Sequence, residues 1–449
     1  MFSHTGSPPP ASVDTASPKR WVYPGLTPAF VLLVSCFAAW GLAGNMTDPL
    51  VKVFSSVFSM SAFQSSLVQF AYYGAYFALA IPAAFINNRL GYKVGVIIGL
   101  ALAASGCMLF IPAASVMTYG FFIFALFTLA SGLSILETSA NPFIMAMGPD
   151  TNATRRLNFA QAFNPIGSNL GVFFAATFIL PFVNPATAEQ RAALSEAELK
   201  SIQSSELAAV MGPYVALGAL YIAIAIGIFL VKIPPQPQAV ERTIPRTSNS
   251  RLLRLLKNKR YSFGVIAQYF NIAAQTCIWT YTIHYVMQVL PVDEGEAGWY
   301  LQVSLILFLI TRFGMVWLMG RIDPRRLMLF MTMLGVAFAA LAVLSPNAFG
   351  IVGLLGMSGC LSLLFPTIYG IALDGLGEDT KFGSAGLVMA IVGGATMPMA
   401  QGWLIDATSA SFSYIIPGIC FALIALYAVY TIKAKPIEYV EGTIARQLS

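Results

Sequence analysis

The sequence contains few charged residues for its length. Only 10% of its 449 residues are Asp, Glu, Lys or Arg, whereas 57% are hydrophobic. A soluble globular chain carries charge at about 25% of its positions, so this chain cannot cover a soluble surface of its size. It is long enough for about a dozen apolar segments of ~20 residues, the length that crosses a bilayer. The composition therefore predicts an all-α polytopic membrane protein.

The chain is also poor in residues that bind metals or attack substrates. It has two histidines and five cysteines, and the cysteines lie in separate apolar segments with no Cys-x-x-Cys spacing. Core packing explains such cysteines better than a disulfide framework or a metal site. The GxxxxGK[ST], HExxH and GxSxG motifs are all missing. We therefore expect no catalytic residue, no metal, no cofactor and no enzyme activity.

Twelve apolar segments are long enough to span a bilayer. We place them at 28–50, 61–86, 94–112, 118–144, 157–183, 211–231, 261–288, 298–319, 327–344, 348–372, 383–405 and 412–431. The predicted organisation is a disordered tail (1–27), a six-helix bundle (28–231), a linker (232–260), a second six-helix bundle (261–431) and a short tail (432–449). Within the first bundle, an amphipathic stretch at 184–210 is expected to fold over the surface.

The basic residues are distributed unevenly between the two sides of the predicted membrane. Of the 25 Lys and Arg residues, 21 fall on the side of the tails, three on the other side, and Arg312 within a span. Because loops rich in Lys and Arg stay in the cytoplasm, both tails and the linker are predicted to be cytoplasmic. In the linker, leucines among the basic residues 251–260 predict a helix that lies on the anionic inner leaflet.

The two predicted halves repeat each other. A basic loop containing Arg89 joins spans two and three, and a similar loop containing Arg321 joins spans eight and nine. Spans four and ten carry matching Asn141-Pro142 and Phe365-Pro366 pairs. Two six-span halves joined by a long loop resemble the layout of the major facilitator superfamily. We assign structural or gating roles to Arg89 and Arg321, and also to Arg312 within span eight.

A polar stretch interrupts the fourth span. Glu137 and Asn141 are four residues apart, so on a helix they share one face. A carboxylate at membrane depth costs roughly 2.5–3.5 kcal/mol on insertion scales and therefore needs a partner, a watery cavity or a proton. Pro142 removes a backbone donor beside them and favours a kink. The pattern indicates a water-filled cavity midway through a transporter.

Two further spans carry polar side chains at helical spacing. Span five has Asn158, Gln161, Asn164 and Ser168, and span seven has Gln268, Asn271, Gln275 and Trp279. Such stripes either bind a ligand or form hydrogen bonds between helices. Their equivalent positions in the two halves favour a polar cavity. Amides with an indole suit a neutral, hydroxyl-rich ligand.

Two charged positions remain open on the residues alone. Asp48, three residues after Asn45 at the end of span one, lies either at the site or in ordinary headgroup water. Arg312 either faces the site or pairs with a carboxylate or with the carbonyls at a helix end.

The sequence around these positions resembles the fucose–galactose–glucose:proton symporter family. The stretches that carry the resemblance are Glu137–Phe143, Asn158–Asn164, Ala274–Thr276 with Trp279, Phe365–Ile368 and Gly377–Ser384. The resemblance implies a major facilitator fold and proton-coupled uptake of a monosaccharide, with L-fucose favoured. It implies proton coupling by Asp48 and Glu137, and sugar contacts by the amides of Asn45 and Gln161. From the polar pattern of the spans, we also expect sugar binding by Glu137, Asn141, Asn164, Gln268, Gln275, Trp40 and Trp279.

Two residues depart from the family pattern, and rival functions stay open. Asn271 stands where the family has an aromatic residue, and Phe365 where fucose-transporting members have Tyr. Galactose, glucose or N-acetylglucosamine are alternative sugars, and a sensor without transport or a channel are alternative functions. The expected partners are the sugar, a proton and the bilayer of the cell (inner or plasma) membrane, without nucleic acid, and the expected functional state is a monomer.

The charge asymmetry makes a prediction about topology. A cysteine introduced at Ser3 in a variant without native cysteines should resist a membrane-impermeant thiol reagent in intact cells, because the tail is predicted to be cytoplasmic. Permeabilised cells provide the control, and they should label fully. Labelling in intact cells would contradict the predicted orientation.

Overall fold

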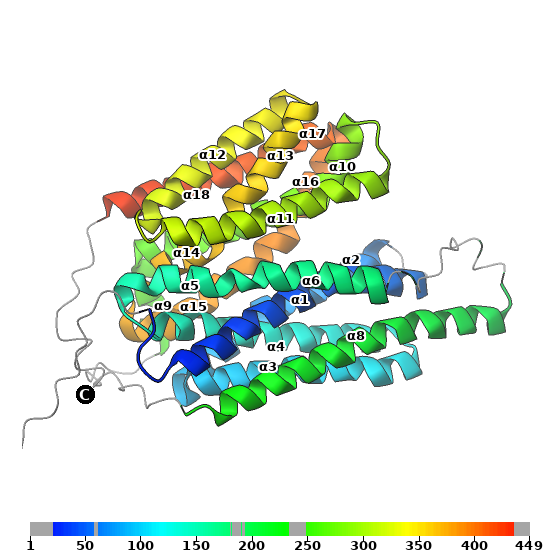
Figure 1. The fold of residues 1–449 in the computed structure, drawn as a ribbon, viewed down its shortest axis with the longest axis horizontal. Coiled ribbons are helices and arrows are strands. Elements are labelled where there is room, and N and C mark those ends of the chain that lie inside the picture. Colours follow the sequence, from blue (N-terminus) through cyan, green and yellow to red (C-terminus); the bar gives the residue numbers. More distant parts are fainter. Residues whose placement is uncertain are drawn as a thin grey trace, which may run out of the picture.

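The computed structural model describes residues 21–57, 62–179, 181, 190, 194–232 and 248–434, and in these its regular elements are all helical (Figure 1). The first half contains α1 (Thr27–Val57), α2 (Ala62–Leu90), α3 (Tyr92–Val116), α4 (Tyr119–Ala146), α5 (Ala153–Gln161), α6 (Phe163–Phe178) and α8 (Glu196–Leu230). The connecting helix is α9 (Ser248–Lys257). The second half contains α10 (Lys259–Val289), α11 (Glu294–Leu318), α12 (Pro324–Leu344), α13 (Ala348–Leu361), α14 (Leu364–Leu373), α15 (Thr380–Met389), α16 (Gly393–Ala407), α17 (Ala410–Ser413) and α18 (Ile415–Lys433).

These helices follow the predicted spans closely. By length and composition, ten helical segments of the described chain can cross a membrane. The other two predicted spans are also helical: span five is divided into α5 and α6, and span seven is the long, more polar α10. Spans ten, eleven and twelve are each built from two α-helices in series, such as α13 and α14.

The amphipathic stretch before span six differs from the prediction. Residues 182–189 and 191–193 lie outside the described residues, but from Glu196 onward the chain forms one helix, α8, that continues into span six. A reciprocal cap starts it: the Ser195 hydroxyl accepts the Glu198 N–H, and the Glu198 carboxylate accepts the Ser195 N–H at 3.0 Å. This cap extends the span at its start, so the second part of the stretch is not a separate surface element.

Glycines bring helices of the same half into backbone contact. A Cβ on Gly41 of α1 would lie 2.0 Å from the Asn164 carbonyl oxygen of α6, and one on Gly167 would lie 1.8 Å from the Ala38 carbonyl oxygen. Gly106 of α3 meets the backbone of α4 in the same way. Small residues permit such close approach, which supplies van der Waals contact where lipid offers no hydrophobic drive.

The two halves converge on the side where α1 begins and α18 ends, here termed the tail side, and diverge toward the opposite side (Figure 1). On the tail side, α14 packs on α5, and α15 packs on α2 and α4. Phe85 and Phe382 form an edge-to-face pair with ring centroids 5.2 Å apart. The buried Asn158 side chain donates to the Thr367 hydroxyl at 3.2 Å across the same interface.

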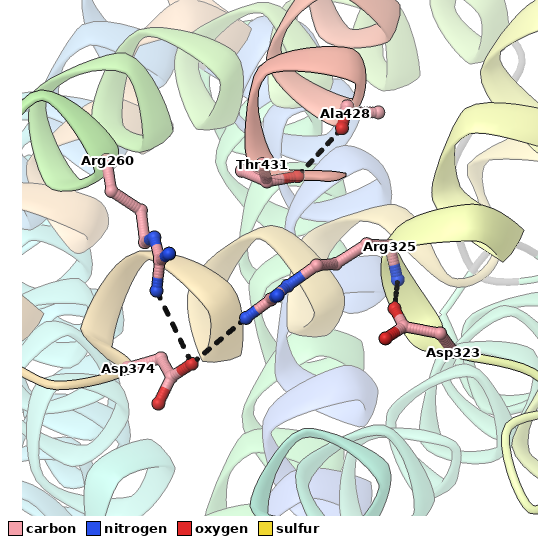
Figure 2. Close-up of polar contacts among 6 residues, drawn as sticks. All are labelled: Arg260, Asp323, Arg325, Asp374, Ala428 and Thr431. Atoms are coloured by element: carbon pink, nitrogen blue, oxygen red, sulfur yellow. Dashed lines mark hydrogen bonds and ion pairs between the residues drawn. The ribbon is translucent and has the colours of Figure 1, made fainter. Parts of the chain in front are cut away.

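An ion cluster on the tail side joins three helices of the second half (Figure 2). One carboxylate oxygen of Asp374, just after α14, lies 3.7 Å from the Arg260 guanidinium and 3.2 Å from that of Arg325. Asp323 caps α12 by accepting the Arg325 N–H at 2.7 Å. A separate pair, Arg254 of α9 with Asp379, is bidentate at 2.9 and 2.7 Å and ties the connecting helix to the second half.

The α1–α6 contact predicts the effect of one methyl group. Gly167→Ala should lower the unfolding free energy by about 1–3 kcal/mol, because the new Cβ overlaps a carbonyl on α1. Gly314→Ala in α11 is the matched control, since nothing lies within 4 Å of its Cβ position. Thermal unfolding of the purified variants compares them. Equal melting temperatures for Gly167→Ala and wild type would show that the backbones are not in contact.

Candidate functional site

The polar stretch of α4 is fully enclosed. Every residue from Ser134 to Phe143 is buried, and the helix continues through Pro142. Among the described residues, neither carboxyl oxygen of Glu137 has a hydrogen-bond partner. An isolated carboxylate buried in this way is strongly disfavoured, so the geometry favours a protonated Glu137 or one that meets a ligand.

A hydrogen bond between Gln161 and Asn141 joins the fifth span to α4 near Glu137. The Gln161 side-chain amide donates to the Asn141 side-chain oxygen at 2.8 Å, and both residues are buried. This bond leaves the Asn141 Nδ2 group without a partner in the described chain. Because Asn141 lies one turn from Glu137, the amide pair and the acid form one polar group on the inner face of the first half.

Further buried polar atoms lie on α10 and α14 of the second half and on α2 of the first. Both side-chain polar atoms of Gln268 and of Asn271 on α10 lack partners in the described chain, as do the hydroxyls of Tyr76 on α2 and Tyr369 on α14. Tyr76 and Tyr369 lie close enough to Glu137 to interact with it electrostatically. An unsatisfied buried polar group costs about 1–3 kcal/mol, so several together indicate a place where a polar ligand supplies the partners.

Neighbouring polar groups of α4 are satisfied within the protein. Ser139 donates to the Asn87 side-chain oxygen at 2.8 Å, and Asn87 donates to the Thr138 carbonyl at 3.3 Å. Ser134 donates to the Tyr76 carbonyl at 3.1 Å. The contrast separates the face of α4 that holds α2 in place from the face that carries Glu137 and Asn141.

The remaining predicted site residues have other partners. Asn164 donates to the Phe37 carbonyl at 3.3 Å, Asn45 to the Gly41 carbonyl at 3.4 Å, and the Trp279 indole to the Ser358 hydroxyl at 3.1 Å. All three are partly exposed, as are Trp40 and Gln275. Asp48 falls within α1, but its side chain lies outside the described residues.

The three arginines assigned structural or gating roles have different surroundings. Arg312 is 3% exposed and donates to backbone carbonyls, the second of the alternatives that the sequence left open. Arg89 is exposed at the end of α2, and Arg321 is exposed with its guanidinium 3.9 Å from the centre of the Trp317 ring. In the second loop, Arg325 rather than Arg321 is bonded to an acidic residue, Asp374.

Sequence reasoning missed both tyrosines that flank Glu137. Tyr369 lies four residues after Phe365 and stacks on it, with ring centroids 6.1 Å apart. Because the family resemblance singled out Phe365 as a position that could face the sugar, the four-residue spacing was a usable signal for Tyr369. Tyr76 sits in an apolar, aromatic-rich part of α2, where no pattern distinguishes it from core residues.

Comparisons with known proteins concern the chain as a whole. The Major Facilitator Superfamily model matches residues 29–390. An L-fucose-proton symporter from Haemophilus influenzae is 40% identical over 91% of this chain and 96% of its own length. A glucose/galactose transporter from Brucella abortus is 31% identical over 95% of this chain and 98% of its own.

A solved structure supports the same architecture. FucP, a Major Facilitator Superfamily transporter solved in the outward conformation, superposes with a TM-score of 0.84 at 33% identity. The match covers 91% of this chain and 99% of that one. The predicted all-helical fold of twelve membrane-spanning helices is thus confirmed.

Proposed function

The chain belongs to the major facilitator superfamily, and within it we propose that the protein is a proton-coupled symporter of a monosaccharide, L-fucose first among the candidates. The observation that carries the proposal is the enclosed Glu137 carboxyl beside the Gln161–Asn141 amide pair. An acid that gains and loses a proton at the place where amides meet sugar hydroxyls can link the movements of both ligands.

The proposed path uses the two halves as rigid units that rock around the site. In the outward-facing arrangement Glu137 takes up a proton and the amides bind the sugar, and closure then carries the neutral carboxyl inward. One charge that crosses 100 mV contributes about 2.3 kcal/mol, enough for roughly a 50-fold sugar gradient at 1.4 kcal/mol per decade. We assign the first proton exchange to Asp48, which lies nearer the outer mouth in the predicted topology.

The remaining expectations belong to the same proposal. We infer that the protein functions as a monomer in the inner or plasma membrane, with both tails in the cytoplasm and the halves bounded at 28–231 and 261–431. Galactose or glucose is the second candidate substrate class, because a 31% identical relative is a glucose/galactose transporter. Phe365 and Asn271, both buried, are the positions we expect to distinguish the sugars.

One experiment separates the proposed activity from its rivals. Purified protein in sealed vesicles should accumulate labelled L-fucose when an inward proton gradient is imposed, and excess unlabelled sugar should saturate the uptake. A sensor would bind the sugar without uptake, and a channel would equilibrate it without accumulation. Galactose, glucose and N-acetylglucosamine tested in parallel identify the preferred sugar.

The amides of the first half generate a prediction about affinity. Asn45→Ala and Gln161→Ala should each weaken L-fucose binding about 5- to 100-fold, because losing a buried hydrogen bond costs about 1–3 kcal/mol. Titration calorimetry on the purified variants measures the change. Ser105→Ala in α3, an exposed hydroxyl bonded to its own helix, is the control that should bind normally. Wild-type affinity in both variants would show that neither Asn45 nor Gln161 contacts the sugar.

The two acids generate a prediction about coupling. Asp48→Asn should abolish accumulation against a gradient yet preserve exchange of internal for external sugar, because exchange moves no net proton. Glu137→Gln should change sugar affinity as well, since this side chain is proposed to meet both ligands. Accumulation and exchange in the same vesicles distinguish the two effects. If Asp48→Asn still accumulates sugar, the proton takes another route.

A further inference from the structure

Two membrane spans, one in each half, are broken two residues before a proline. Pro165 is the third residue of α6, and Pro366 is the third residue of α14. A proline has no N–H and cannot donate to the carbonyl four residues earlier. The carbonyls deprived of their helical donors are those of Gln161 and Ser362. In a membrane protein each needs a donor from elsewhere.

Arg312 on α11 supplies the donor for both. Its Nη1 group donates to the Gln161 carbonyl at 3.0 Å, and its Nε group donates to the Ser362 carbonyl. The guanidinium also lies 4.5 Å from the centre of the Phe308 ring. One rigid, planar fork therefore satisfies two orphaned carbonyls in two helices, which the single ammonium of a lysine cannot reproduce.

Helix ends explain how the positive charge is accommodated. Among the described residues, no carboxylate lies within ion-pair distance of Arg312. The two accepting carbonyls instead belong to the C-terminal ends of α5 and α13, where the helix dipole places partial negative charge. The ring of Phe308 adds a cation–π contact.

The bond to Gln161 connects this cation to the candidate site. Gln161 is the last residue of α5, and its side chain donates to Asn141, one turn from Glu137. On the other side, the Ser362 break precedes the helix that carries Phe365 and Tyr369. We propose that Arg312 is a positioning residue for transport: by clamping both proline breaks it fixes the site amide of the first half against the aromatic pair of the second.

This inference rests on the proposed function, because it takes L-fucose as the ligand. The first test is substitution of Arg312. Arg312→Met should weaken L-fucose binding about tenfold, because the Gln161 backbone loses its donor and the side-chain amide loses its fixed position. Arg312→Lys should fall between Met and wild type, because lysine keeps the charge and one bond but not the fork. Calorimetry measures affinity, and thermal unfolding measures stability in the same preparations.

A rescue experiment separates positioning from a general structural role. Pro165→Ala restores an N–H four residues after Gln161, which can donate to the Gln161 carbonyl. In this background, Arg312→Met should therefore lower L-fucose affinity and melting temperature much less than it does in the wild-type background. Pro112→Ala, within α3 and away from the breaks, is the matched control and should rescue neither. The double-mutant cycle isolates the Arg312–Pro165 coupling.

The outcomes are distinct. Recovery by Pro165→Ala but not by Pro112→Ala supports the clamp. Unchanged affinity in Arg312→Met, or equal recovery by both prolines, overturns it. If wild-type protein does not bind L-fucose, the proposed substrate fails, while the cycle in melting temperature needs no sugar and still decides whether Arg312 serves the carbonyl at the break.

Discussion

Inside a bilayer, a polar group finds its partner within the protein or in a ligand, because no bulk water is available to it. This constraint separates the scaffold of the molecule from its site. Asn87, Ser139 and Thr138 satisfy one another and hold α2 against α4. Glu137 has no partner in the described chain, although it lies on the same helix. Polar atoms left unsatisfied on both halves therefore mark where the transported molecule is proposed to meet the chain.

The same constraint explains two buried cations that bind no acid side chain in the described chain. Arg156 donates to five carbonyls, three of which, those of Ile144, Met145 and Gly148, lie at or just past the end of α4. Arg312 does the same at the two helix breaks. In both cases a guanidinium donates to backbone carbonyls at or beside the end of a helix. A buried arginine in a membrane span therefore indicates interrupted helices as readily as it indicates a charged substrate.

The all-helical class, the spans and the polar face of α4 could be predicted from the sequence, because composition and four-residue spacing are local properties. Gln161 and Asn141 could each be predicted as site residues, but the hydrogen bond between them could not. Tyr76 and the role of Arg325 were not predictable, since each depends on which helices become neighbours. The break in span five was missed although Pro165 was visible, because a proline in the first turn of a helix is also tolerated without consequence.

The glycine contacts have a mechanical consequence. Within a half, Gly41, Gly106 and Gly167 lie directly against the backbone of the adjoining helix, where an added Cβ would overlap backbone atoms. Between the halves, a Cβ on Gly370 or Gly394 would instead meet side-chain atoms, which include those of Thr154 and Tyr73. At these positions the contacts within a half are between backbones, whereas the contacts across the seam involve side chains. We therefore expect the two halves to move relative to each other by changes of side-chain rotamer along the seam, while the helix pairs joined by Gly41, Gly106 and Gly167 keep their spacing.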